Sequence, residues 1–373
     1  MQQQPPGPEA AVLVSIDFGE SDHSESLEEL LLLAETAGVR TLAVVQTKRQ
    51  RPDAALFAGS GKVQEIAELV ERMEVPLVIF NHDLSPAQMR NLIAKLNTRV
   101  IDRTMLILDI FAQRAQSHEG KVQVELAQLR YLATRLVGQG VGMGQQKFAV
   151  GARGPGETKL ELDRRKLDKR VHLLKDRLEK LRHQRAVQRR SRSRADVLSV
   201  SIVGYTNAGK STLFNRLTRA DVNVADQLFA TLDTTSRRMF TEGQGEIVVS
   251  DTVGFIRHLP HSLVAAFRST LEETIQADLL LHVVDANNAN RDDQIAEVNK
   301  VLTEIGAADI PQVLVFNKID LQDVPPSVQR DDYGRIARIF LSAKSGAGLD
   351  GLQLALAEAK AARQAHEATG QTD

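Results

Sequence analysis

The most informative segment of this 373-residue chain is Gly204-Tyr205-Thr206-Asn207-Ala208-Gly209-Lys210-Ser211, which fits the pattern G-x-x-x-x-G-K-[ST]. It follows an apolar run at 197–203 and precedes a helical pattern that begins with Ser211 and Thr212. Glycines let backbone N–H groups turn inward around phosphate oxygens, and the helix N-terminus adds the positive end of its dipole. The segment predicts a phosphate-binding loop in which Lys210 neutralises the β- and γ-phosphates and Ser211 ligates Mg²⁺.

A second segment, Asp251-Thr252-Val253-Gly254, ends the apolar strand pattern at 245–250. We expect Asp251 to hold the Mg²⁺ ion through water and the Gly254 amide to meet the γ-phosphate. On this interpretation, Lys210 and Gly254 contribute to catalysis as well as to binding.

Two later segments predict the base that the site accepts. Asn317-Lys318-Ile319-Asp320 ends the strand pattern at 312–316, and Asp320 can accept hydrogen bonds from the N1–H and N2–H groups of guanine. Adenine has no donor at N1, so it would leave that carboxylate unpaired. Ser342-Ala343-Lys344 ends the last strand and can offer a backbone amide to the guanine O6. Because open α/β sheets bind ligands at the carboxyl ends of their strands, the set predicts a GTP and GDP site.

The stretch Phe229-Ala230-Thr231-Leu232-Asp233 has a weak regular pattern and places Thr231 21 residues after Lys210. We interpret it as a switch loop that contacts the nucleotide, with Thr231 catalytic and, together with Ser211, a ligand of Mg²⁺ when a γ-phosphate is present.

Phe255 follows Gly254, at the position where many GTPases carry a glutamine that orients the attacking water. Phenylalanine can neither donate nor accept that hydrogen bond. We hypothesise slow intrinsic hydrolysis that accelerates when a partner supplies or orders a catalytic group. The alternative is that another residue of this chain orients the water.

Alternation of short apolar runs with helical patterns predicts an α/β fold at both ends of the chain. Residues 10–118 predict a small lobe with a parallel sheet, and residues 197–363 a G domain with one open, mainly parallel sheet covered by helices on both faces. Between them, 119–195 predicts a helical hairpin whose two apolar-striped helices are joined by a Gly-rich loop. We expect 364–373 to be a polar, frayed tail.

The second hairpin helix carries a strong local charge. Residues 158–195 hold 15 Lys or Arg and five Asp or Glu, a net charge of +10 in a chain whose total is −1. Such a concentration beside a loop matches the electrostatic footprint of a nucleic-acid contact, although a solvated charged face remains an equal alternative.

Composition excludes several other classes. The chain has no Cys, which removes disulfides, thiolate metal sites and cysteine nucleophiles. It has no apolar run of membrane-spanning length and no basic-then-apolar start typical of a secretory signal, so we expect no membrane span and a cytoplasmic protein.

Taken together, these residues resemble the HflX family, ribosome-associated GTPases of the Obg-HflX group. Beside the nucleotide motifs, the resemblance rests on five stretches: Gly59-Ser60-Gly61-Lys62-Val63, Asp109–Ala115, Val124–Leu129, Arg153–Thr158 and Asp163-Arg164-Arg165. It implies an α/β lobe, a helical hairpin and a G domain that binds the large ribosomal subunit and ribosomal RNA. Separately from the resemblance, we expect a monomer. It also implies splitting or rescue of stalled ribosomes under stress, or a role in subunit biogenesis.

Two departures from simple expectations concern the loops. Thr234 stands where the family usually has proline, which should loosen the switch loop. Asn207 resembles GTPases in which this position helps to place K⁺, and an unchanged rate on replacing K⁺ with Na⁺ would contradict that hypothesis.

The segment at 59–62 does not make a second phosphate-binding loop, because Leu56 stands where the pattern needs glycine and Val63 follows Lys62. A tight turn into a helix is the preferred interpretation over an ATP site. For the whole chain, the alternatives to a ribosome-stimulated GTPase are a slow-turnover, GTP-gated binding module for another RNA or protein, and a metabolic kinase, which Asp320 disfavours.

Overall fold

The structure is a computed structural model that describes residues 9–20, 22–136, 159–193, 197–219, 227–241, 245–257, 259–260, 263 and 271–370. The predicted Gly-rich loop, the segment Arg153–Thr158 and Arg194 lie outside these residues. The chain forms two compact units, Met1–Gln113 with Lys121–Leu178 and Arg114–Gly120 with Glu179–Asp373. Within the described part of the chain, no helix is both long and apolar enough to cross a membrane.

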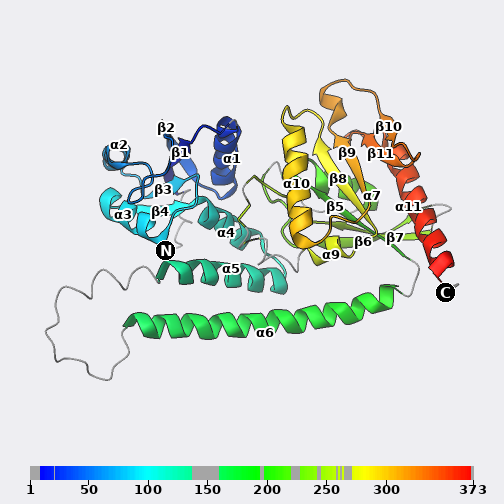
Figure 1. The fold of residues 1–373 in the computed structure, drawn as a ribbon, viewed down its shortest axis with the longest axis horizontal. Coiled ribbons are helices and arrows are strands. Elements are labelled where there is room, and N and C mark those ends of the chain that lie inside the picture. Colours follow the sequence, from blue (N-terminus) through cyan, green and yellow to red (C-terminus); the bar gives the residue numbers. More distant parts are fainter. Residues whose placement is uncertain are drawn as a thin grey trace, which may run out of the picture. The chain divides into compact units, whose positions relative to one another are not determined.

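The first unit contains the predicted parallel sheet (Figure 1), with the order β2-β1-β3-β4. Its strands are β1 (Ala10–Asp17), β2 (Arg40–Lys48), β3 (Leu77–Phe80) and β4 (Arg99–Asp102), all paired in parallel. The helices are α1 (His23–Thr36), α2 (Ser60–Arg72), α3 (Pro86–Leu96) and α4 (Arg103–Arg114). Apolar side chains of α2 and α3 pack with Val12, Val14 and Val78 of the sheet, so the alternating pattern correctly predicted this lobe.

Gly59 ends the turn that leads into α2, as the sequence predicted. Its φ of +83° lies in the left-handed region, and a Cβ there would lie 2.1 Å from Arg49 Nη1. That guanidinium donates to the Ala58 carbonyl at 2.9 Å. The segment therefore serves as a tight turn into a helix.

The hairpin is formed by α5 (His118–Leu136) and α6 (Lys159–Ser193). Val122 and Leu126 of α5 pack with Leu174 and Leu178 of α6, and all four side chains are buried. These are the stripe positions that the three- and four-residue spacing predicted.

The second unit contains a seven-stranded sheet with the order β10-β11-β9-β8-β5-β7-β6. The five inner strands are parallel: β5 (Leu198–Gly204), β7 (Gly245–Asp251), β8 (Leu279–Asp285), β9 (Gln312–Asn317) and β11 (Ile336–Phe340). The edge strands β6 (Thr235–Thr241) and β10 (Ser327–Arg330) pair antiparallel. The remaining elements are α7 (Lys210–Thr218), α9 (Glu272–Ile275), α10 (Arg291–Ile305), η1 (Ile319–Leu321) and α11 (Leu349–Gly370).

Helices cover both faces of this sheet, which confirms the predicted layering. Leu213 of α7 and Leu352 of α11 share a core with Leu281 and Val315. On the opposite face, Ile295 of α10 packs against side chains from the alternate strand positions Val284, Leu314 and Phe316.

Three features differ from the sequence predictions. Both edge strands were missed, because neither carries a buried apolar run. The predicted tail 364–373 is helical as far as Gly370, since its alanines, Gln364 and Glu367 are compatible with a helix although they are polar overall. Residues 114–120 belong to the unit that contains the G domain, whereas the sequence analysis placed 10–118 in the first domain; the contacts responsible are described below.

One buried histidine makes the stability of the second unit depend on pH. His282 of β8 is 1% exposed, and Gln312 Nε2 donates to its Nδ1 at 2.5 Å. Burial, and to a lesser extent the charge of Lys210, lowers the pKa of His282 from 6.5 to about 4. Between about pH 6.5 and pH 4, His282 is therefore protonated in the unfolded chain but neutral in the folded chain, and this difference favours unfolding.

We expect protonation of His282 to lower the free energy of unfolding by about 2 kcal/mol when the pH falls from 7.5 to 5. Urea unfolding across this range should show a flatter pH dependence for His282→Gln than for the wild type. The exposed His172→Gln serves as the control and should keep the wild-type slope. Equal slopes for the wild type and His282→Gln would contradict the assignment.

Candidate GTP-binding site

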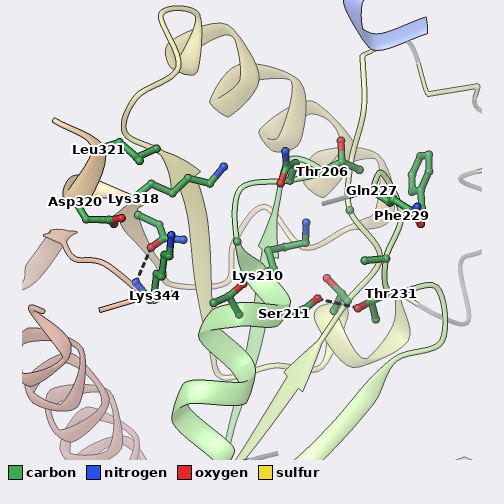
Figure 2. Close-up of a pocket in the computed structure, with 18 residues that line it drawn as sticks. Thr206, Lys210, Ser211, Gln227, Phe229, Thr231, Lys318, Asp320, Leu321 and Lys344 are labelled. Carbon is green, nitrogen blue, oxygen red and sulfur yellow. Dashed lines mark hydrogen bonds between the residues drawn. The ribbon is translucent and has the colours of Figure 1, made fainter. Parts of the chain in front are cut away.

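A cavity of about 430 Å³ opens at the carboxyl ends of the parallel strands in the second unit. Figure 2 shows Asp320, Lys318 and Leu321 at one end of it, and Thr231 and Phe229 at the other, with Lys210 and Ser211 between them. Its lining is drawn from the phosphate-binding loop, the switch loop and the loops after β7, β9 and β11. The predicted segments therefore converge on one cavity.

The phosphate-binding loop packs closely against neighbouring segments at two glycines. A Cβ at Gly204 would lie 2.2 Å from the Val283 carbonyl oxygen, and one at Gly209 would lie 2.2 Å from Asn317 Nδ2. Both residues have positive φ, +145° and +93°, so no other residue fits without displacing its neighbours.

Lys210 is buried at the base of this loop. Its Nζ donates to the Tyr205 carbonyl at 2.8 Å. Burial lowers the pKa of Lys210 from 10.5 to about 8, and the nearby Asp251 opposes the shift. The ammonium group is thus largely desolvated, which strengthens its attraction for a phosphate anion.

Three side-chain oxygen groups meet beside the lysine. Ser211 Oγ donates to Asp251 Oδ2 at 2.7 Å, Thr231 Oγ1 donates to the same oxygen at 2.8 Å, and the two hydroxyl oxygens lie 2.8 Å apart. Burial raises the pKa of Asp251, although Lys210 and the two hydroxyls oppose the shift. The other carboxylate oxygen, Oδ1, is buried and has no hydrogen-bond partner among the described residues. A hard divalent cation such as Mg²⁺, which prefers oxygen ligands, fits this donor set.

The loop after β7 is attached to the phosphate-binding loop. The Thr206 amide donates to the Phe255 carbonyl at 2.7 Å, and the Phe255 amide donates to the Gly204 carbonyl at 3.2 Å. Phe255 itself is 1% exposed. A Cβ at Gly254 would lie 2.6 Å from Thr206 Cγ2 and 2.9 Å from Lys210 Nζ. The loop therefore requires glycine at 254 and buries the side chain at 255 in the core.

Asn317 connects two loops near the end of the cavity that Lys318 and Asp320 line, which we call the base end because Asp320 is the residue predicted to contact the guanine base. Its Nδ2 donates to the Ala208 carbonyl at 2.9 Å, and its Oδ1 accepts from the Ala343 amide at 2.8 Å. Lys318 Nζ pairs with Asp285 Oδ2 at 2.8 Å. Asp320 is exposed and lines the cavity, so its carboxylate is accessible to the edge of a base.

Most of the predicted site residues line the cavity: Thr206, Asn207, Gly209, Lys210, Ser211, Thr212, Phe229, Ala230, Thr231, Thr252, Gly254, Asn317, Lys318, Asp320, Ala343 and Lys344. The other predicted residues belong to the same segments but do not line the cavity: Gly204, Tyr205, Ala208, Leu232, Asp233, Asp251, Val253, Ile319 and Ser342. Asp233 is a separate case, because its carboxylate accepts from the Gln116 and Ser117 amides, both at 2.8 Å.

The structure adds three residues that the sequence analysis missed. Gln227 and Leu321 line the cavity, and Arg216 of α7 donates through Nε to the Ala343 carbonyl at 3.2 Å. Leu321 could have been predicted from the sequence, because it directly follows Asp320. Arg216 and Gln227 carry no local signal, because their partners are distant in the sequence.

Lys210 lies close to the side-chain oxygens of Ser211, Thr231 and Asp251, and the Asp320 carboxylate, which can distinguish guanine from adenine, lines one end of the cavity. This arrangement, on a mainly parallel sheet whose first loop leads into α7, defines a P-loop GTPase.

Comparison with known proteins agrees with that class over most of the chain. Residues 24–112 match the family described as GTP-binding GTPase N-terminal, 114–192 the GTP-binding GTPase Middle Region, and 199–318 the 50S ribosome-binding GTPase family. The GTPase HflX of Escherichia coli (strain K12) is 55% identical over 351 residues, which cover 94% of this chain and 82% of that protein. The GTPase HflX of Caldanaerobacter subterraneus subsp. tengcongensis is 47% identical, with 92% and 79% covered.

The chain belongs to the HflX family of GTPases. Among solved structures, the complex of SsGBP with GDP is 26% identical, with a TM-score of 0.52 and coverage of 94% of this chain and 97% of that chain. The resemblance inferred from the sequence motifs is thereby confirmed.

Proposed function

We propose that this GTPase binds the large ribosomal subunit and uses GTP hydrolysis to split or rescue stalled ribosomes, or to act in subunit biogenesis. The match of residues 199–318 to the 50S ribosome-binding GTPase family is the observation that carries this proposal. The alternative is a slow-turnover, GTP-gated module that binds another RNA or protein.

The charge of α6 supports an RNA partner. The basic side chains of α6 between residues 164 and 180 are all exposed: Arg164, Arg165, Lys166, Lys169, Arg170, Lys175, Arg177 and Lys180. Few acidic side chains accompany them, and Arg170 Nη2 pairs with Glu125 Oε1 at 2.7 Å. An exposed helix with this excess of positive charge suits contact with a phosphate backbone.

In the proposed reaction, water attacks the γ-phosphorus of GTP, and the bond from that phosphorus to the β–γ bridging oxygen breaks to give GDP and phosphate. Lys210 stabilises the charge that develops on the phosphate oxygens, and the Gly254 amide donates to the γ-phosphate. Mg²⁺, held by Ser211 and Thr231 and through water by Asp251, would supply further charge neutralisation.

The buried Phe255 side chain supports the hypothesis of slow intrinsic hydrolysis, because it leaves no polar group of residue 255 near the attacking water. We propose that the ribosome supplies or orders the missing group. A K⁺ ion beside Asn207, which is exposed and lines the cavity, remains a hypothesis.

Sedimentation with ribosomal subunits, in GDP or in a non-hydrolysable GTP analogue across a salt series, tests the proposal. We expect the GTP analogue to favour co-sedimentation with the large subunit, and ribosomal subunits to stimulate turnover. Replacing Arg189, Arg190, Arg192 and Arg194 by Gln should lower the slope of log affinity against log salt by about 1 for each arginine that contacts a phosphate.

A charge-matched control replaces the exposed Arg40, Arg51, Arg72 and Lys95 of the N-terminal lobe by Gln. It should leave the salt slope unchanged. Equal salt slopes for the wild type and the α6 variant would indicate that the basic side chains of α6 form a solvated surface and do not contact phosphates. If ribosomal subunits do not change the rate of GTP turnover, the binding-module alternative is favoured.

A further inference from the structure

The short segment 114–120 connects α4 with α5, yet it is packed with the GTP-binding unit. We call it the linker segment, and from here on the switch loop, first defined as 229–233, also includes Gln227 and Leu228. The linker segment lies outside every nucleotide motif of the sequence. Its contacts with the switch loop place it in the same compact unit as the cavity.

The first contact lies two residues after Thr231. Asp233 Oδ2 accepts from the backbone amides of Gln116 and Ser117, both at 2.8 Å, and Asp233 Oδ1 accepts from Ser117 Oγ at 2.5 Å. One carboxylate therefore receives three hydrogen bonds from two consecutive residues. Hydrogen bonds to an ionised acceptor are stronger than neutral ones, so this is a firm attachment for a loop.

The second contact lies on the other side of Thr231. Arg114 Nη2 donates to Oε1 of Gln227, and Gln227 lines the cavity. The switch loop is thus held by the linker segment at both its ends, 227 and 233, with Thr231 between them. Thr231 is 8% exposed and is bonded to Asp251, as described above.

The start of α5 is built to accept this carboxylate. Ser117 immediately precedes α5, and its Oγ accepts from the Gly120 amide at 2.8 Å while it donates to Asp233. A Cβ at Gly120 would lie 2.1 Å from Asp233 Oδ1. Only glycine leaves room for the carboxylate, and a negative charge is favourable at the N-terminus of a helix.

We propose that Asp233 and the linker segment are positioning elements of the GTPase reaction: they hold the switch loop so that Thr231 stays beside Ser211 and Asp251. The nucleotide site then extends into the connection between the N-terminal lobe and the hairpin. Because α5 begins at this attachment, release of the switch loop also releases the first turn of the hairpin. This inference rests on the proposed role of Thr231 toward the γ-phosphate and Mg²⁺.

The test compares four changes in the full-length chain, Asp233→Asn, Gly120→Ala, Ser117→Ala and Ser117→Thr, with Thr231→Ala as the reference. The readouts are the single-turnover rate of GTP hydrolysis and the ratio of the affinities for a non-hydrolysable GTP analogue and for GDP. GDP lacks the γ-phosphate that Thr231 responds to, so loss of the switch loop should weaken the analogue selectively.

We expect Asp233→Asn and Gly120→Ala each to lower both the hydrolysis rate and the affinity ratio about tenfold. A tenfold effect is what the loss of one hydrogen bond to a charged group produces. Ser117→Ala keeps the two backbone hydrogen bonds and should lower the rate and the ratio about threefold. Ser117→Thr keeps the hydroxyl group and should leave both at their wild-type values. Gly120→Ala is the sharpest variant, because alanine favours the helix and yet displaces the carboxylate.

The matched control is Asp331→Asn. Asp331 also accepts from two backbone amides, those of Tyr333 and Arg335, but in the turn after β10. It should leave the rate and the ratio unchanged. If the linker and Asp233 variants weaken GDP and the analogue equally, or leave the ratio unchanged while Thr231→Ala lowers it, the inference is overturned. A wild-type ratio in Thr231→Ala would overturn the proposed role of Thr231 and the inference with it.

Discussion

Replacing Asp320 by Asn is expected to weaken GTP binding by about 10² to 10³ and to give the protein a preference for xanthosine triphosphate. The carboxylate offers two acceptor oxygens to the N1–H and N2–H donors of guanine. An asparagine amide presents one acceptor and one donor, so its NH₂ group would face the N2–H donors. Losing one hydrogen bond to a charged group and leaving two donors facing each other costs about 3 to 4 kcal/mol, which corresponds to this range.

Xanthine carries an oxygen where guanine carries the N2 amino group, so it matches the amide of the variant. Equilibrium titration of both proteins with GTP, ATP and xanthosine triphosphate measures the effect. Asp323→Asn is the control, because it removes the same charge three residues further along and does not line the cavity. If the Asp320 variant keeps its preference for GTP over ATP, the assignment of the base end is wrong.

The sequence predicted the nucleotide motifs because each of them is local. The glycines at 204 and 209, the lysine at 210 and the carboxylate at 320 follow buried apolar runs, and parallel pairing of those runs brings their ends together. The order of the strands was not predicted, because it is set by pairing between segments that lie far apart in the sequence.

Elements without a buried stripe could not be predicted in the same way. β10 is exposed at every position and β6 contains Arg237 and Arg238, so neither shows the apolar run of a strand. Their pairing comes from the free edges of β11 and β7. The Asp233 attachment was missed for a related reason: its partners are 116 and 117 residues away, and aspartate near a GTP site is first interpreted as a nucleotide contact.

The same long-range contacts explain why the domain boundaries predicted from the pattern of apolar residues differ from the compact units. The texture changes near residue 119, where the amphipathic helix begins, whereas the contacts of 114–120 are made with the switch loop. A boundary between elements of secondary structure is therefore not a boundary of packing. In this chain the difference falls at the segment that we propose to position Thr231.

Replacing Lys210 by Met is expected to lower GTP hydrolysis by at least about 10² while making the folded protein more stable. Methionine keeps most of the length of the side chain but removes the charge that would stabilise the transferring phosphate, a loss comparable with that of one preorganised donor at an anionic transition state. The protein stability should respond in the opposite direction, because the ammonium group is buried and its pKa is lowered to about 8.

A shift of this size corresponds to an unfavourable desolvation of about 3 kcal/mol, and we expect Lys210→Met to recover about 1 to 3 kcal/mol of it as unfolding free energy. Single-turnover kinetics and urea unfolding on the same preparation measure the two effects. Loss of activity together with a gain in stability excludes misfolding as the cause.

Lys318→Met makes the same chemical change at the other end of the cavity, where Lys318 is paired with Asp285. It should weaken GTP and GDP to a similar extent and alter the single-turnover rate at saturating GTP by less than about threefold. Two lysines that line one cavity would then be separated by their effects, one on chemistry and one on nucleotide affinity. A Lys210 variant that hydrolyses GTP at the wild-type rate would remove the lysine from the proposed reaction.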